Sequence, residues 1–136
     1  MNEKRCVLVV EDDDEFQEIL VEGLGKRLHE MRIVVAATVE DAVDAFQSQP
    51  NCAVVLDYDN GVTGNLNYLP FYLWLEQTAP DFARDRVILH TVRYRDEMRE
   101  IFEAAHTKFF PAYAHKGKID QLATFIQSLP PLSEKE

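Results

Sequence analysis

The feature that most constrains this 136-residue chain is a repeated change in the spacing of its apolar residues. Short, continuous apolar runs alternate five times with stretches in which apolar residues recur every three or four positions. Continuous runs are typical of strands buried on both faces, and the wider spacing is typical of amphipathic helices. The pattern therefore predicts one α/β domain, a doubly wound sheet of five parallel strands with helices on both faces.

The expected strands are short, and a helix is expected after each. We place them at residues 6–10, 33–37, 53–56 and 87–91, with a fifth within 108–114. The helix that follows Pro70 is unusual, because residues 71–75 are all apolar. Burial beneath a loop at 80–86 is the favoured explanation, while an exposed docking patch over residues 68–74 stays open.

Charge and composition narrow the range of functions. Fourteen Lys and Arg residues against 24 Asp and Glu residues give a net charge of −10, which argues against nucleic acid and anionic membranes as partners. No apolar run reaches the length of a membrane span or of a secretory signal, so we expect a cytoplasmic protein. Cys6 and Cys52 form no metal-binding or redox motif, and we expect buried thiols.

Ionisable side chains follow three of the expected strands. The acidic run at 11–14 follows the first strand, Asp57 follows the third, and Lys116 follows the fifth. In the common strand order 2-1-3-4-5, the first and third strands are neighbours. Glu11, Asp12 and Asp57 would then converge at the edge of the sheet where doubly wound domains bind ligands.

Converging carboxylates need a counter-charge. Two of them about 4 Å apart repel by roughly 4 kcal/mol at an effective dielectric constant near 20. An all-oxygen site with room for water suits Mg²⁺ better than Ca²⁺. The run at 11–14 alone is more typical of the first turn of a helix, and Asp57 is what favours a magnesium site.

Four segments at these strand ends together resemble the CheY-like receiver domain of two-component response regulators. They are VLVVEDD at 7–13, VVLD at 54–57, VILHT at 87–91 and AYAHK at 112–116. The resemblance covers residues 4–129, leaving a short tail at 130–136, and it implies the flavodoxin-like fold. It also implies a stand-alone signalling protein that catalyses its own phosphoryl transfer and slow dephosphorylation, rather than an enzyme with a separate substrate.

The resemblance assigns roles to individual residues. Asp57 would be the phospho-acceptor, and Lys116 would pair first with its carboxylate and then with the phosphoryl oxygens. Mg²⁺ would be bound by Asp12 directly, by Glu11 through water, by Asp57, and by the backbone carbonyl of Asp59. Phosphoryl transfer needs this arrangement because the protein mainly positions the reactants and neutralises charge.

Two further residues match the switch pair of the family. The Thr91 hydroxyl would move toward the phosphoryl group, and the Tyr113 ring would then turn inward. The implied partners are a sensor histidine kinase or phosphotransfer protein and a downstream protein target. The target would contact residues 95–105, 108–114 and 118–129, and a homodimer stays open.

The chain departs from the family pattern at several positions. Gly117 follows Lys116 where the family usually has a cis-proline, and Gly61 stands where a proline usually follows the acceptor. Asp59 and Arg93 are expected to alter the rate of dephosphorylation rather than phosphorylation itself.

Two alternatives remain open. A degenerate receiver could act as a phosphorylation-independent protein-interaction module. A phosphohydrolase of the haloacid dehalogenase type is favoured less. Its motif would fall at 55–61, after the third strand rather than the first, and the chain lacks its later metal-binding motif.

Overall fold

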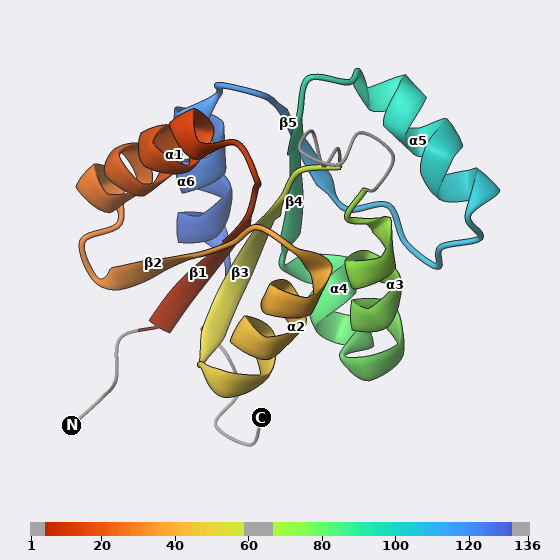
Figure 1. Cartoon of the computed structure of the whole chain (residues 1–136), viewed down its shortest axis with the longest axis horizontal. Coiled ribbons are helices and arrows are strands. Elements are labelled where there is room, and N and C mark those ends of the chain that lie inside the picture. The colour runs from red at the N-terminus through yellow and green to blue at the C-terminus, as the bar shows by residue number, and fades with distance from the viewer. Residues whose placement is uncertain (1–4, 59–66, 132–136) are drawn as a thin grey trace.

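The computed structural model describes residues 5–58 and 67–131, which form a five-stranded parallel sheet flanked by helices (Figure 1). The strand order is β2-β1-β3-β4-β5, as the sequence predicted. The strands are β1 (Arg5–Val10), β2 (Met31–Ala36), β3 (Asn51–Leu56), β4 (Val87–Thr91) and β5 (Ala112–His115).

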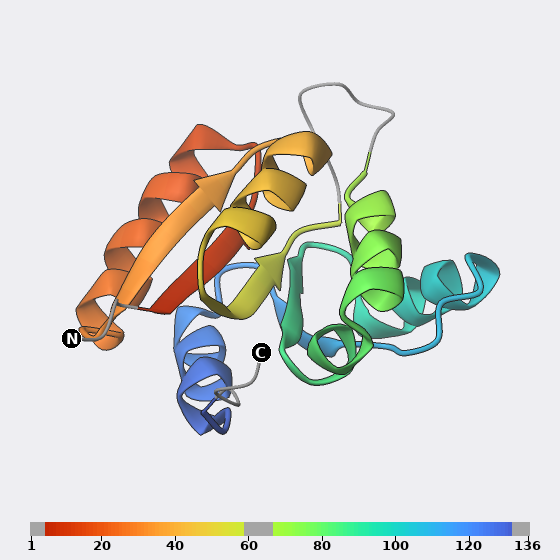
Figure 2. The same ribbon diagram turned by 90° about the horizontal axis from the view of Figure 1, so that it is seen from below.

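Helices cover both faces of the sheet, so the layering is that of a doubly wound domain (Figures 1 and 2). On one face, α1 and α6 pack against Val7, Val9 and Val55. On the other face, the remaining helices pack against Leu8 and Val10. The helices are α1 (Asp14–Arg27), α2 (Val39–Ser48), α3 (Leu69–Thr78), α4 (Pro80–Asp85), α5 (Arg95–Ala104) and α6 (Ile119–Ser128).

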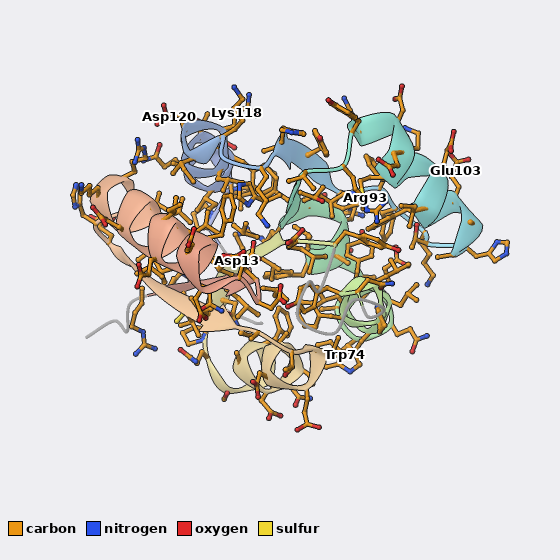
Figure 3. All side chains as sticks on the ribbon, turned by 45° about the horizontal axis from the view of Figure 1, so that its top comes forward. Asp13, Trp74, Arg93, Glu103, Lys118 and Asp120 are labelled. Atoms are coloured by element: carbon orange, nitrogen blue, oxygen red, sulfur yellow. The ribbon has the colours of Figure 1, made fainter. Side chains whose placement is uncertain are left out.

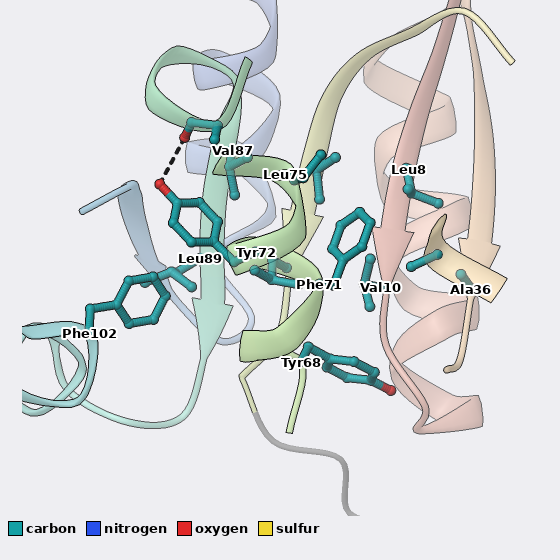
Figure 4. Close-up of a cluster of buried hydrophobic side chains, with 14 of the residues drawn as sticks. Leu8, Val10, Ala36, Tyr68, Phe71, Tyr72, Leu75, Val87, Leu89 and Phe102 are labelled. Carbon is teal, nitrogen blue, oxygen red and sulfur yellow. Dashed lines mark hydrogen bonds between the residues drawn. The ribbon is translucent and has the colours of Figure 1, made fainter. Parts of the chain in front are cut away.

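The apolar segment around α3 is buried, which decides between the two explanations left open by the sequence. Tyr68, Phe71 and Tyr72 have no exposed surface and lie among the residues of the larger apolar cluster (Figure 4). The Tyr68 hydroxyl donates a hydrogen bond to the carbonyl of Ala37 at 2.6 Å, and the Tyr72 hydroxyl donates one to that of Ala83 at 3.0 Å. Segment 68–74 therefore belongs mainly to the core, rather than forming a docking patch.

Residues 80–86, expected as a loop, contain helix α4, so that prediction was wrong. Pro80 stands at the first helical position, where its missing N–H costs nothing, and the Arg86 N–H donates to the Phe82 carbonyl at 2.9 Å. With six residues, α4 has fewer than two helical turns, which is too short to show a helical repeat of apolar residues in the sequence. It covers α3 as the loop was expected to do.

The fifth strand, Ala112–His115, begins inside the predicted range of 108–114 and ends one residue beyond it. The buried carboxylate of Glu76 accepts hydrogen bonds from the backbone N–H groups of Lys108 and Phe109 at 2.9 to 3.0 Å, and Pro111 has no N–H. Pairing with β4 therefore begins only at Ala112 and continues to His115.

Smaller expectations can also be compared with the structure. The second strand runs over Met31–Ala36 rather than 33–37. Both cysteines are buried and free, as expected. Among the helices in the described ranges, none has the length and apolarity needed to cross a membrane.

Candidate functional site

The carboxylates of Glu11 and Asp57 lie side by side because their strands pair in parallel. The Asp57 N–H, just after β3, donates to the Val10 carbonyl at 3.1 Å, and the Glu11 N–H donates to the Ala36 carbonyl at 3.0 Å. Glu11 is 1% exposed and Asp57 is 4% exposed. Carboxylate oxygens of Glu11, Asp12 and Asp57 lie within 4.8 Å of one another, so the predicted convergence is present.

The ammonium of Lys116 stands between two of these carboxylates. Its Nζ lies 3.0 Å from Oε1 of Glu11 and 3.0 Å from Oδ2 of Asp57. It also lies 4.3 Å from the centroid of the Phe16 ring, a cation–π contact. Burial alone would lower the pKa of Lys116, but the two carboxylates outweigh burial, so its pKa is raised and the side chain stays charged.

One ammonium does not balance three carboxylates. Burial, and then repulsion by Asp57, raise the pKa of Glu11 to about 7, although Lys116 acts in the opposite direction. The residues therefore fit a hard divalent cation, because all donors are oxygens and the cluster carries excess negative charge. Glu11, Asp12 and Asp57 are the side chains that could hold it.

Asp13 has a different role from its acidic neighbours. Its Oδ1 caps α1, accepting hydrogen bonds from the N–H groups of Glu15 and Phe16 at 3.0 and 3.2 Å (labelled in Figure 3). The acidic run at 11–14 thus contains both features considered from the sequence. Glu11 and Asp12 belong to the carboxylate cluster, and Asp13 begins the helix.

Thr91 and Tyr113 are connected through the backbone of one residue, Arg93. The buried Oγ1 of Thr91 accepts a hydrogen bond from the Arg93 N–H at 3.3 Å. The hydroxyl of Tyr113 donates to the Arg93 carbonyl at 2.6 Å and lies 3.0 Å from Nδ1 of His115, which must then be the donor of that second bond. Both residues of the expected switch pair therefore bind the backbone of Arg93.

The side chain of Arg93 extends toward Tyr58, the residue that follows Asp57. Its guanidinium carbon lies 5.2 Å from the centroid of the Tyr58 ring, next to Asp57, and Nη1 lies 2.7 Å from the Glu97 carboxylate. Asp59, which the sequence suggested as a carbonyl ligand to the metal, lies outside the described residues, as does Gly61.

Sequence reasoning missed two residues that contact this site, Phe16 and His90. Phe16 is one of the apolar residues of α1, and nothing in the sequence marks it as a neighbour of Lys116. His90 is 1% exposed on β4, and its Nε2 accepts a hydrogen bond from the Gly117 N–H at 2.9 Å. The signal available was a single ionisable residue within the otherwise apolar or hydroxyl-bearing run at 87–91.

Comparisons with known proteins give matches in structure only. No protein-family model matches the chain, and no curated protein matches it in sequence. The receiver domain of the DNA-binding response regulator merR from Colwellia psychrerythraea is 21% identical, with 90% of this chain and 95% of that chain covered at a TM-score of 0.69. CheY4, a chemotaxis protein of Vibrio cholerae, is 15% identical, with 92% and 98% covered at a TM-score of 0.71.

A third similar structure was solved with a bound ligand. Response regulator TrrA of Thermotoga maritima, solved in complex with Mg²⁺-BeF, is 21% identical, with 90% and 96% covered at a TM-score of 0.67. These structures share their fold with this chain. The chain therefore has the CheY-like fold of response-regulator receiver domains, as the sequence motifs suggested.

Proposed function

We propose that the chain is a receiver that accepts a phosphoryl group on Asp57 from a histidine kinase or phosphotransfer protein. The observation that carries this proposal is the position of the Lys116 ammonium, 3.0 Å from both Glu11 and Asp57. A nucleophilic carboxylate, a fixed cation and further carboxylate ligands are the groups that phosphoryl transfer to aspartate requires.

In the proposed reaction, a carboxylate oxygen of Asp57 attacks the phosphorus of a phosphohistidine in line with the P–N bond. The new P–O bond forms as the P–N bond breaks, and the departing imidazole keeps the electron pair and takes a proton from water. Lys116 balances the charge of the phosphoryl oxygens beside Asp57. Mg²⁺, held by Glu11, Asp12 and Asp57, would supply further positive charge next to these oxygens.

The output would be a change on the surface formed by α5, β5 and α6. A phosphoryl oxygen on Asp57 is a strong acceptor, and the Thr91 hydroxyl is the proposed donor to it. Because Thr91 and Tyr113 both bind the Arg93 backbone, moving the Thr91 hydroxyl would loosen the hydrogen bond of Tyr113. A partner protein that reads this surface would then detect the phosphorylated state.

The experiment is phosphorylation by acetyl phosphate in the presence of Mg²⁺, followed by intact mass. We expect the mass to rise by one phosphoryl group, and no rise in Asp57→Asn. Asp13→Asn is the matched control, because asparagine also caps helices and Asp13 lies outside the cluster; it should be phosphorylated like the wild type. No mass gain in the wild type would favour the phosphorylation-independent interaction module.

A further inference from the structure

The turn that carries Lys116 is attached to β4 at two neighbouring residues. The Lys116 N–H donates to the Thr91 carbonyl at 2.9 Å, and the Gly117 N–H donates to Nε2 of His90 at 2.9 Å. The first bond continues the sheet ladder, which any residue other than proline could do. The second bond uses a buried side chain and needs an unprotonated ring nitrogen as the acceptor.

Gly117 has the conformation that this attachment requires. Its φ is +98°, a backbone geometry that residues with a side chain rarely adopt, and the Lys118 N–H closes the turn on the His115 carbonyl at 3.1 Å. A proline at this position could neither adopt a positive φ nor donate the hydrogen bond. The residue that departs from the family pattern is therefore the one that His90 holds.

The imidazole of His90 also contacts the ring beneath the ammonium. The rings of His90 and Phe16 meet edge to face with centroids 6.4 Å apart, and Nζ of Lys116 lies 4.3 Å from the centroid of that Phe16 ring. His90 thus contacts both the residue that follows Lys116 in the chain and the aromatic ring beside the Lys116 ammonium.

A buried histidine at position 90 is expected to lower the stability of the protein relative to an apolar residue. Among the described residues, its Nδ1 has no hydrogen-bond partner although the side chain is buried. Burial, and then the charge of Lys116, lower the pKa of His90 to about 4, so the ring is neutral near pH 7 and Nε2 can accept. An apolar residue of similar size would avoid the unpartnered Nδ1 but would lose this acceptor.

We propose that His90 is a positioning residue, which fixes the Lys116 turn through the Gly117 N–H and so holds the ammonium beside Asp57. The effect on phosphoryl transfer rests on the function proposed above, whereas the effect on the position of Lys116 does not. Two variants separate the hydrogen bond from the packing. His90→Leu removes the acceptor, and His90→Gln retains an acceptor of similar reach.

The first measurement is the reactivity of Lys116 toward reductive methylation, which does not depend on phosphorylation. The exposed Lys118 in the same protein serves as the internal reference. In His90→Leu we expect Lys116 to be modified about fivefold faster relative to Lys118, the equilibrium effect of losing one neutral hydrogen bond. His90→Gln should stay close to the wild type. Equal reactivity in the wild type and the leucine variant would overturn the proposal.

The second measurement is the initial rate of phosphorylation by acetyl phosphate with Mg²⁺. We expect a loss of about fivefold in His90→Leu and recovery in His90→Gln. If Lys116 becomes more reactive in the leucine variant but even the wild type takes up no phosphate, the positioning role stands and the receiver function fails. An unchanged rate with increased reactivity would contradict the part of the proposal that concerns phosphoryl transfer.

Circular dichroism at the assay temperature establishes that each variant is folded. If His90→Leu is unfolded, Gly117→Ala tests the same attachment from the other side. A Cβ at Gly117 would meet no atom within 4 Å, so this variant acts only through its positive φ. It should also increase the reactivity of Lys116, and unchanged reactivity would overturn the proposal.

Discussion

Nζ of Lys116 lies 3.0 Å from Oδ2 of Asp57, although 59 positions separate the two residues in the chain. The contact exists because β3 and β5 both end at the same edge of the sheet, with β4 between them. Because this contact joins a buried carboxylate to an ammonium, the stability of the site depends on the balance of charge within it.

Replacing Lys116 by Met should destabilise the protein in the absence of a metal. The substitution removes the ammonium that lies between Glu11 and Asp57, at a cost of about 2 kcal/mol. The cost is less than for a fully buried pair because Glu11 can take up a proton. Urea unfolding near pH 8 measures the difference. Lys26→Met is the control: its ion pair with Glu22 is 71% exposed on both sides, so the change should be small. Equal losses in the two variants would argue against a strained carboxylate pair.

Magnesium should stabilise the wild type. A ligand that binds only the folded state adds about 2.7 kcal/mol at a hundredfold excess over its dissociation constant. Thermal unfolding in MgCl₂, against NaCl at matched ionic strength, should show a higher midpoint in the wild type and in Asp13→Asn. The gain should be lost in Asp12→Asn. An equal gain in all three proteins would indicate a site elsewhere.

The dependence of stability on pH should differ between the wild type and His90→Gln. The folded pKa of His90, about 4, is below its ordinary value of 6.5, so its contribution to stability is present above pH 6.5 and is lost as the pH falls through 4. Glu11 acts in the opposite sense, because its pKa is raised from 4.5 to about 7 and its contribution is lost as the pH rises through 7. Between pH 4.5 and pH 6.5, the effects of His90 and Glu11 on the free energy of unfolding oppose each other in the wild type.

Removing His90 should therefore expose the effect of Glu11. From pH 7 to pH 4.5, the free energy of unfolding of His90→Gln should rise by about 2 to 3 kcal/mol relative to the wild type. Urea unfolding at both pH values gives this number. Parallel curves for the two proteins would mean that His90 titrates normally in the folded state.

Thr91 and Tyr113 should be energetically coupled through the Arg93 backbone. A double-mutant cycle of Thr91→Val and Tyr113→Phe should give an interaction energy of about 0.5 to 1 kcal/mol in urea unfolding. The control cycle pairs Tyr113→Phe with Tyr72→Phe, whose hydroxyl binds the Ala83 carbonyl in a different part of the molecule. Additivity in both cycles would remove the support for a linked switch.

Much of the fold was predictable because the three central strands, β1, β3 and β4, are buried on both faces. The runs at 6–10 and 53–56 contain enough apolar residues to be recognised without periodicity, and the common strand order 2-1-3-4-5 then placed Glu11 beside Asp57. Helix α4 was missed because six residues are too few to show a helical repeat. The point within 108–114 at which β5 begins was not predictable, because Glu76, distant in sequence, binds the backbone at Lys108 and Phe109.

The details of the site depended on contacts that no local pattern reveals. Lys116 was found because it follows a strand, as Asp57 does. The bond from Gly117 to His90 joins residues 27 positions apart, and it depends on a turn whose glycine was read only as a departure from the family. Asp59 remains a prediction.

The proposed function requires that Asp57 forms an acyl phosphate. Borohydride reduces an aspartyl phosphate to homoserine, so peptide mapping after treatment with acetyl phosphate and Mg²⁺ identifies the residue that was modified. We predict homoserine at position 57, and none when Mg²⁺ is omitted and replaced by a chelator. Homoserine at a different aspartate, or at none, would contradict the proposed phosphorylation of Asp57.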